Sequence, residues 1–96
     1  MSVDVSVIIP HLNDHDNLLR TLASLGDQDA QNISFEIIVV DNGSENPLPR
    51  AVSLNPRVIV AYESTRGPGP ARNLGVSIAS GRILAFIDSD CIADPN

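Results

Sequence analysis

Four apolar runs recur along the chain, each short enough for a single buried strand. They cover residues 5–10, 35–40, 57–62 and 82–87, and turn-forming residues such as proline, glycine and aspartate flank them. Runs of this length that are rich in valine and isoleucine predict strands covered on both faces.

Between the first two runs, apolar positions recur with the period of a helix. This helix should begin at Asn13 or Asp14, either of which can cap it, and end at Gly26. Its core side is predicted to be a leucine stripe of Leu18, Leu22 and Leu25. Its solvent side is predicted to hold Asp14, Asp16, Asn17, Arg20 and Thr21.

Two further helices are expected. The one within residues 46–54 should be weak, because Pro47 and Pro49 lack the backbone N–H that a helix needs. The other should follow the glycine-rich turn with Pro70 near its first turn, and end at Gly81. Its buried stripe is predicted to be Ala71, Leu74, Gly75, Ile78 and Ala79.

The alternation of strands and helices predicts an α/β fold of the Rossmann-like kind. Such a fold would have a parallel sheet of about four strands with helices on both faces. The 96 residues suffice for one domain. Because they end at Asp94-Pro95-Asn96, directly after a motif and with no closing element, we expect residues 1–96 to form a single partial domain.

Polar residues gather where these strands end, and ligands of open parallel sheets bind there. They are Pro10, His11 and Asn13 after the first strand, Asp41, Asn42, Gly43 and Ser44 after the second, and Asp88 and Asp90 after the fourth. Asp88 and Asp90 are two residues apart, so in an extended chain their carboxylates point the same way and suit Mg²⁺ or Mn²⁺ with a diphosphate. The alternatives are an ordinary surface triplet for this pair and a turn cap for Asp41.

The turn at residues 67–73 is a second candidate site. A glycine-rich turn entering a helix offers free N–H groups to a phosphate, and Arg72 could add a bidentate contact. The alternative is an ordinary helix start in which Arg72 pairs with a surface acid.

Composition removes several classes of function. Twelve acids against six bases give a formal charge of −6, which disfavours nucleic acid and anionic membranes as partners of this segment. All six bases are arginine, so P-loop kinases, receiver domains and haloacid-dehalogenase-like phosphatases, which use a lysine, are excluded. The single Cys91 and the absence of a basic leader or long apolar run favour the cytoplasm, although parts not present here could attach to a membrane.

Histidines four residues apart can bind zinc when they share a helix face. His11 should precede the helix that contains His15, so a shared face is not expected for this pair.

Four motifs in order resemble those of family 2 glycosyltransferases, which have the GT-A fold. They are residues 6–10 with Asn13 and the Leu22–Gln28 segment, residues 36–44, residues 69–75, and residues 85–91 with their Asp-x-Asp. They span nearly the whole chain, which would then be the first half of that fold. His11 and Leu12 depart from the family, which more often has a small polar residue and an aromatic there.

The resemblance implies a role for each matching residue. Pro10 would line the pocket of the nucleotide base, Asp41 would hydrogen-bond the base, typically uracil, and Arg72 would approach the base or the diphosphate. Asp88 would face the ribose or sugar and share the metal site, and Asp90 would coordinate Mg²⁺ or Mn²⁺. Asn13, Gly43 and Ser44 belong to the same motifs and are predicted to join the nucleotide-sugar site.

The implied reaction is inverting transfer from a nucleotide-diphosphate sugar, a UDP-sugar in the first instance, to an acceptor hydroxyl. The metal would neutralise the leaving diphosphate. The acceptor could be a carbohydrate, lipid or protein. The general base would lie in a later half, so the 96-residue chain is expected to be inactive alone. The alternative is a non-catalytic nucleotide-binding or interaction module. An exposed sheet edge could also make the chain a homo-oligomer.

Overall fold

The computed structural model describes residues 3–26 and 34–87, in which a four-stranded parallel sheet forms the centre. Its strands are β1 (Val5–His11), β2 (Phe35–Asp41), β3 (Val58–Tyr62) and β4 (Ile83–Phe86), in the spatial order β3-β2-β1-β4. Neighbouring strands are parallel throughout, which confirms the predicted α/β class.

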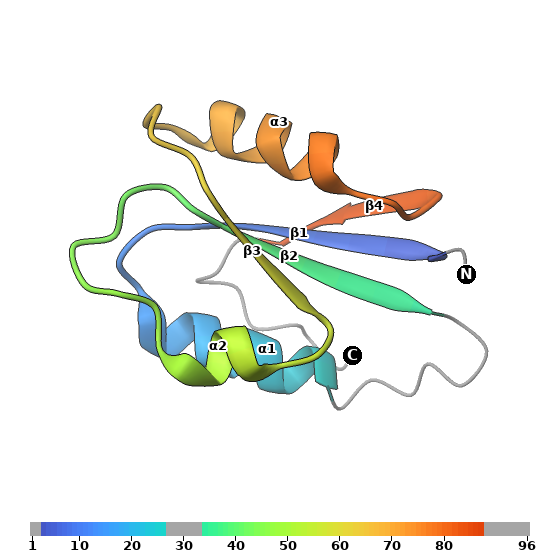
Figure 1. The fold of residues 1–96 in the computed structure, drawn as a ribbon, viewed down its shortest axis with the longest axis horizontal. Helices are drawn as coiled ribbons and strands as arrows, with labels where there is room; N and C mark the ends of the chain where they lie inside the picture. Colours follow the sequence, from blue (N-terminus) through green and yellow to red (C-terminus); the bar gives the residue numbers. More distant parts are fainter. Residues whose placement is uncertain (1–2, 27–33, 88–96) are drawn as a thin grey trace.

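Helices cover both faces of the sheet, as the alternation predicted (Figure 1). α1 (His15–Gly26) and α2 (Arg50–Leu54) pack on one face, and α3 (Pro68–Ile78) packs on the other. α2 is shorter than the predicted 46–54 segment because it begins only after Pro49. α3 begins at Pro68, so Pro70 lies in its first turn as expected, and the helix ends at Ile78 instead of Gly81.

Strand alternation divides the interior into two cores. Val7, Ile9 and the corresponding residues of β2 pack with the leucines of α1 and with Val52 of α2. Ile8 and the alternate residues of β2 pack with Ala71 of α3. α3 lies so close to the sheet that a Cβ placed on Gly75 would come within 2.4 Å of Cγ2 of Ile8.

The predicted solvent face of α1 was wrong at one position, because Thr21 is fully buried. Thr21 lies three residues after Leu18 and four before Leu25, so helix periodicity places it on the same stripe as these leucines. The short side chain of threonine, with its methyl group, fits this interior position.

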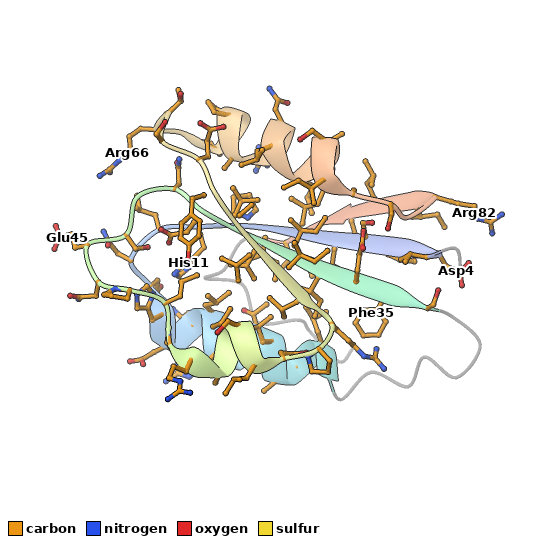
Figure 2. The ribbon with its side chains drawn as sticks, in the orientation of Figure 1. Asp4, His11, Phe35, Glu45, Arg66 and Arg82 are labelled. Atoms are coloured by element: carbon orange, nitrogen blue, oxygen red, sulfur yellow. The ribbon has the colours of Figure 1, made fainter. Side chains whose placement is uncertain are left out.

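Polar contacts join the amino end of the sheet to the turn before β4. The carboxylate of Glu36 accepts hydrogen bonds from the Ser6 hydroxyl (2.6 Å) and from the backbone N–H (2.8 Å) and hydroxyl (3.0 Å) of Ser80. Burial raises the pKa of Glu36, but these hydrogen bonds lower it further than burial raises it, so the net shift is downward. Asp4 and Arg82 lie at this same end, opposite to the end that carries His11 and Glu45 (Figure 2).

No helix within residues 3–26 and 34–87 has both the length and the apolar character to cross a membrane.

Candidate functional site

Three loops meet at the carboxyl ends of β1, β2 and β3. Each contains one residue with a left-handed backbone: Asn13 (φ 65°), Gly43 (φ 99°) and Gly67 (φ 121°). Glycine and asparagine tolerate this conformation better than other residues. The sharp turns that they permit bring the three loops together at the predicted ligand-binding edge.

Asp41 is the central carboxylate of this edge. It ends β2, is only 6% exposed, and accepts hydrogen bonds from the backbone N–H (3.1 Å) and the hydroxyl of Ser44. Asp41 therefore does cap a turn, as the simpler interpretation held. The turn also fixes the direction of its carboxylate, which leaves further lone pairs available as acceptors.

Asn13 joins the loop after β1 to the loop after β2. Its backbone N–H donates to the Ser44 hydroxyl, and its side-chain oxygen accepts from the backbone N–H of Glu45, both at 2.8 Å. α1 begins at His15, and the side-chain oxygen of Asn13 holds the neighbouring loop instead of capping the helix. Asn13 thus supports the turn that orients Asp41, and its place in the nucleotide-sugar site stays a prediction.

Asn42 performs the same joining role between the loops after β2 and β3. Its amide donates to the carbonyls of Glu63 and Thr65, and its oxygen accepts from the N–H of Gly67, each at 2.9 Å. The side chain is buried and uses its hydrogen-bonding groups on these three backbone partners. Sequence reasoning placed Asn42 at the ligand-binding edge but did not predict these partners, because they lie more than twenty positions away.

His11 and His15 make a third connection, which sequence reasoning also missed. Nε2 of His11 lies 2.8 Å from Nδ1 of His15, and Nε2 of His15 lies 3.0 Å from the carbonyl oxygen of Asn46. A carbonyl only accepts, so Nε2 of a neutral His15 carries its hydrogen, and Nδ1 accepts from His11. His11 ends β1 and is outside α1, as expected, so the pair spans a strand and a helix.

This arrangement leaves Nδ1 of His11 as a buried acceptor with no hydrogen-bond partner. Burial, followed by the neighbouring His15, lowers the pKa of His11, while Asp41 and Asp14 act in the opposite direction. His11 is therefore held in the neutral form that the hydrogen-bond chain requires.

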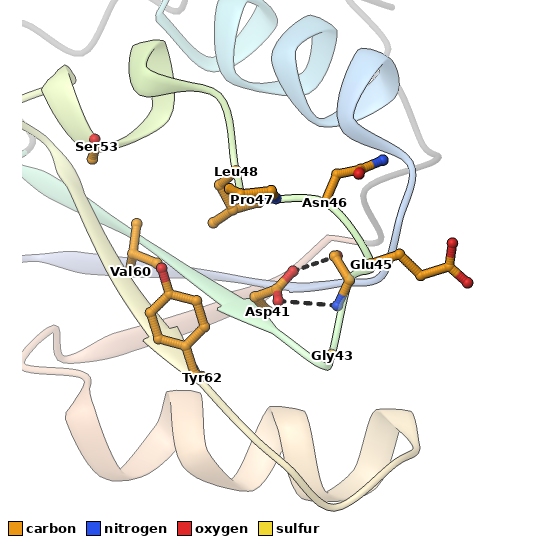
Figure 3. A pocket seen from close by; sticks show the side chains of 10 residues that line it. Asp41, Gly43, Glu45, Asn46, Pro47, Leu48, Ser53, Val60 and Tyr62 are labelled. Carbon is orange, nitrogen blue, oxygen red and sulfur yellow. Dashed lines mark hydrogen bonds between the residues drawn. The ribbon is translucent and has the colours of Figure 1, made fainter.

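A hollow of about 550 Å³ opens between the ends of β2 and β3, the following loop and α2 (Figure 3). It is lined by Asp41, Gly43, Ser44, Glu45, Asn46, Pro47, Leu48, Ser53, Val60 and Tyr62. This volume is in the range of small-molecule sites. Polar groups stand on the loop side, and Leu48, Val60 and Tyr62 supply apolar surface.

The predicted nucleotide-sugar residues divide into three groups. Asp41, Gly43 and Ser44 line the hollow together. Pro10 lies in β1 beside Val40, on the face that α3 covers, and Arg72 is an exposed residue of α3, so neither borders the hollow. Asp88 and Asp90, with the predicted metal site, lie outside the described residues.

Arg66 brings a cation to this edge that sequence reasoning did not single out. A Cβ placed on Gly43 would lie 3.3 Å from Nε of Arg66, so the guanidinium passes directly over the Asp41–Ser44 turn. This contact, together with the positive φ, explains why a glycine occupies position 43.

Residues 3–26 and 34–87 contain no cluster of three acidic, histidine or cysteine side chains that could hold a metal ion. His11 and His15 use their facing nitrogens on one another, so zinc gains no support. The donor set proposed from the sequence is a pair of carboxylates, which is the ligand chemistry that Mg²⁺ and Mn²⁺ prefer. That pair follows β4 in the sequence, and Ile87, directly after β4, donates from its backbone N–H to the carbonyl of Ile8 in β1.

The model of the protein family described as glycosyl transferase family 2 matches residues 6–96. Among curated proteins, the succinoglycan biosynthesis protein ExoO of Rhizobium meliloti is 35% identical over 96 residues, which is 97% of this chain and 27% of ExoO. The glycosyltransferase AglE of Haloferax volcanii is 35% identical over 92 residues, covering 91% of this chain and 30% of AglE. The chain thus spans less than a third of the length of these relatives.

Solved structures show the same architecture. Residues 1–349 of the Staphylococcus aureus protein TarS, in complex with UDP, superimpose with a TM-score of 0.77 at 30% identity, over 92% of this chain and 28% of that one. A mannosyltransferase from Pyrobaculum calidifontis in complex with GDP-Man and Mn²⁺ superimposes with a TM-score of 0.82 at 26% identity, over 99% of this chain and 34% of that one. Both neighbours are transferases of the GT-A fold.

Proposed function

The chain belongs to glycosyl transferase family 2, and from that premise we propose that it is the donor-binding part of an enzyme that transfers sugar from a UDP-sugar. The observation that carries the proposal is the Asp41 carboxylate, which the Ser44 turn holds at the mouth of a hollow of about 550 Å³. The carboxyl edge of a parallel sheet is where nucleotides bind in α/β folds. Structural neighbours crystallised with UDP, UDP-GlcNAc and GDP-Man support the donor class.

In this proposal Asp41 accepts a hydrogen bond from the base, and Gly43 and Ser44 shape the turn around it. Pro10 and Arg72 approach the nucleotide from the α3 side of the edge, where the exposed Arg72 carries the guanidinium group that suits a diphosphate. Asn13 acts through Ser44 and Glu45 and holds the turn in place.

Asp88 and Asp90 are the proposed ligands of Mg²⁺ or Mn²⁺, with Asp88 also facing the ribose or sugar. The Mn²⁺ in the mannosyltransferase complex supports a divalent ion. Such an ion, when bound, neutralises charge on the leaving diphosphate. Inverting attack by an acceptor hydroxyl of a carbohydrate, lipid or protein would need a general base from a further part of the enzyme. We therefore expect no transfer by these 96 residues alone.

Calorimetric titration with UDP, with and without Mn²⁺, tests the donor site. The unsubstituted chain should bind UDP more tightly with Mn²⁺. Asp90→Ala should abolish the metal dependence of UDP binding. Asp41→Asn should lower the affinity for UDP with and without Mn²⁺, because it replaces one acceptor oxygen of the carboxylate with a donor NH₂ group. Asp16→Asn, which removes an exposed charge from the first turn of α1, is the matched control and should leave binding unchanged.

The two parts of the proposal fail separately in this experiment. If UDP affinity does not depend on Mn²⁺ or on Asp90 but falls in Asp41→Asn, the proposed metal role is refuted and the proposed nucleotide site is supported. If the folded chain binds neither UDP nor GDP nor TDP sugars, the donor-binding function is refuted for this segment.

A further inference from the structure

Tyr62 is an aromatic side chain at the candidate site for which neither the motifs nor the roles above account. The chain has one tyrosine, two phenylalanines and no tryptophan. Phe35 begins β2 at the opposite end of the sheet, where the Arg57 guanidinium lies 4.2 Å from its ring centre. Phe86 pairs with Ile8, whose side chain packs toward α3. Tyr62 alone of the three lines the hollow beside Asp41.

The ring of Tyr62 is available to a ligand. It is 70% exposed at the carboxyl end of β3, and no hydrogen bond to its hydroxyl is found within the described residues. Leu12, in the turn after β1, is apolar but not aromatic, so its side chain offers no ring for stacking.

The sheet places Tyr62 and Asp41 side by side. They are register partners on neighbouring parallel strands, so their side chains project to the same face, with the backbones about 4.8 Å apart. Figure 3 shows Tyr62 and Asp41 on the same side of the sheet, where both line the hollow together with Val60 and Leu48. A flat apolar wall and an adjacent acceptor therefore border the same space.

We propose that Tyr62 is the surface on which the nucleobase of the donor stacks while Asp41 accepts a hydrogen bond from the ring N–H of that base. This inference rests on the proposed function and names the specificity-determining residue of its base pocket. A base stacked at about 3.5–4 Å from the ring plane brings its polar edge within reach of the neighbouring strand. Because the carboxylate only accepts, the pair selects bases with a ring N–H, such as uracil, over cytosine.

Tyr62 is the only tyrosine in a chain without tryptophan, so its fluorescence reports directly on this position. Uridine and UDP should shorten the fluorescence lifetime of Tyr62, which a stacked base quenches, whereas Mn²⁺ with pyrophosphate should not. A lifetime is insensitive to absorption of the exciting light by the base. Cytidine should act only at much higher concentration than uridine.

Substitutions test the same contact by calorimetry. Tyr62→Ala should lower the affinity for UDP by roughly five- to one-hundred-fold, the range for loss of one base–aromatic stack. The affinity for pyrophosphate should not change. Tyr62→Phe should retain UDP affinity because the ring remains. Ile59→Ala is the matched control, because it removes a part-exposed apolar side chain from the opposite face of β3.

Each outcome separates this inference from the proposed function. If UDP binds without changing the fluorescence lifetime of Tyr62, and binds Tyr62→Ala with equal affinity, the stacking role is refuted. The proposed donor site is not refuted by that result. If free sugars quench Tyr62 fluorescence but uridine does not, the ring contacts a sugar and the base-stacking role is again refuted. If the unsubstituted folded chain binds no nucleotide, both proposals fall together.

Discussion

The hydrogen-bond chain from His11 through His15 to Asn46 depends on both imidazoles being neutral. The neutral pair carries one N–H on each ring, and protonation of either ring adds one more. Either two N–H groups would then face each other across 2.8 Å, or one N–H would have no acceptor. The charged groups facing this pair are Asp41, at the end of β2, and Asp14, before α1, and both favour protonation of His11. Burial and His15 outweigh them, so the pKa of His11 lies below its usual 6.5.

Stability should therefore fall as the pH drops below about 6.5. A histidine whose pKa is lower in the folded chain binds a proton more readily when unfolded, so acid favours unfolding. At a pH well above 6.5 both states are neutral and the effect vanishes. Thermal or urea unfolding between pH 7.5 and 5.5 measures this slope. His11→Asn should flatten the slope and cost about 1 kcal/mol at pH 7.5 from the lost hydrogen bond. An unchanged slope would show that His11 does not titrate in this way.

At the scale of elements, the packing of α3 on β1 depends on the missing side chain of Gly75. Gly75→Ala would place a methyl group 2.4 Å from the Ile8 Cγ2, and Ile8 is fully buried, so the helix or the strand must shift. We expect a loss of about 1–3 kcal/mol in the free energy of unfolding, as for other overpacked cores.

Gly69→Ala is the matched control in the same helix. Apart from its chain neighbours and the backbone of α3, no atom of residues 3–26 and 34–87 lies within 4 Å of a Cβ at position 69. The higher helix propensity of alanine should therefore leave stability unchanged or raise it by up to about 1 kcal/mol. Urea denaturation of the two variants provides the comparison. Equal effects of the two substitutions would mean that the close approach of α3 does not limit stability.

The order and type of the elements could be predicted from sequence because each depends on local patterns. Val-Ile runs and helical leucine spacing fix the strands and α1, and prolines restrict where α2 and α3 begin. The buried Thr21 was missed because residue polarity was weighed above its place on the leucine stripe. Helix ends also moved by a few residues, because the contacts that stop a helix come from elsewhere in the fold.

At the scale of the whole molecule, the candidate site could be located but its internal contacts could not. Strand ends identified Asp41, Gly43 and Ser44, which do line one hollow. The partners of Asn13, Asn42 and His15 lie on loops that only the parallel sheet order brings together. Tyr62 was read as the end of a strand, because its closeness to Asp41 follows from the register of β2 and β3.

The outer edge of β4 has consequences for the molecule in solution. Among residues 3–26 and 34–87, β4 is the last strand of the sheet order, and its Ile83 and Phe86 are 61% and 48% exposed, with Leu84 between them also exposed. An edge strand with unpaired backbone groups and apolar side chains tends to pair with another strand. We propose that two copies of the 96-residue chain associate through β4.

Sedimentation velocity over a range of concentrations measures this association. The unsubstituted chain should show a concentration-dependent dimer, and Leu84→Lys should shift it toward monomer by at least about tenfold in the dissociation constant, because a charge would have to be buried at the pairing edge. Ile59→Lys places the same charge on β3, the other edge strand, at similar exposure, and should leave association through β4 unchanged. A monomer at all concentrations would refute the association. A dimer that is sensitive to Ile59→Lys but not to Leu84→Lys would move the interface to β3, next to Tyr62 and the candidate base pocket, where UDP would then compete with it.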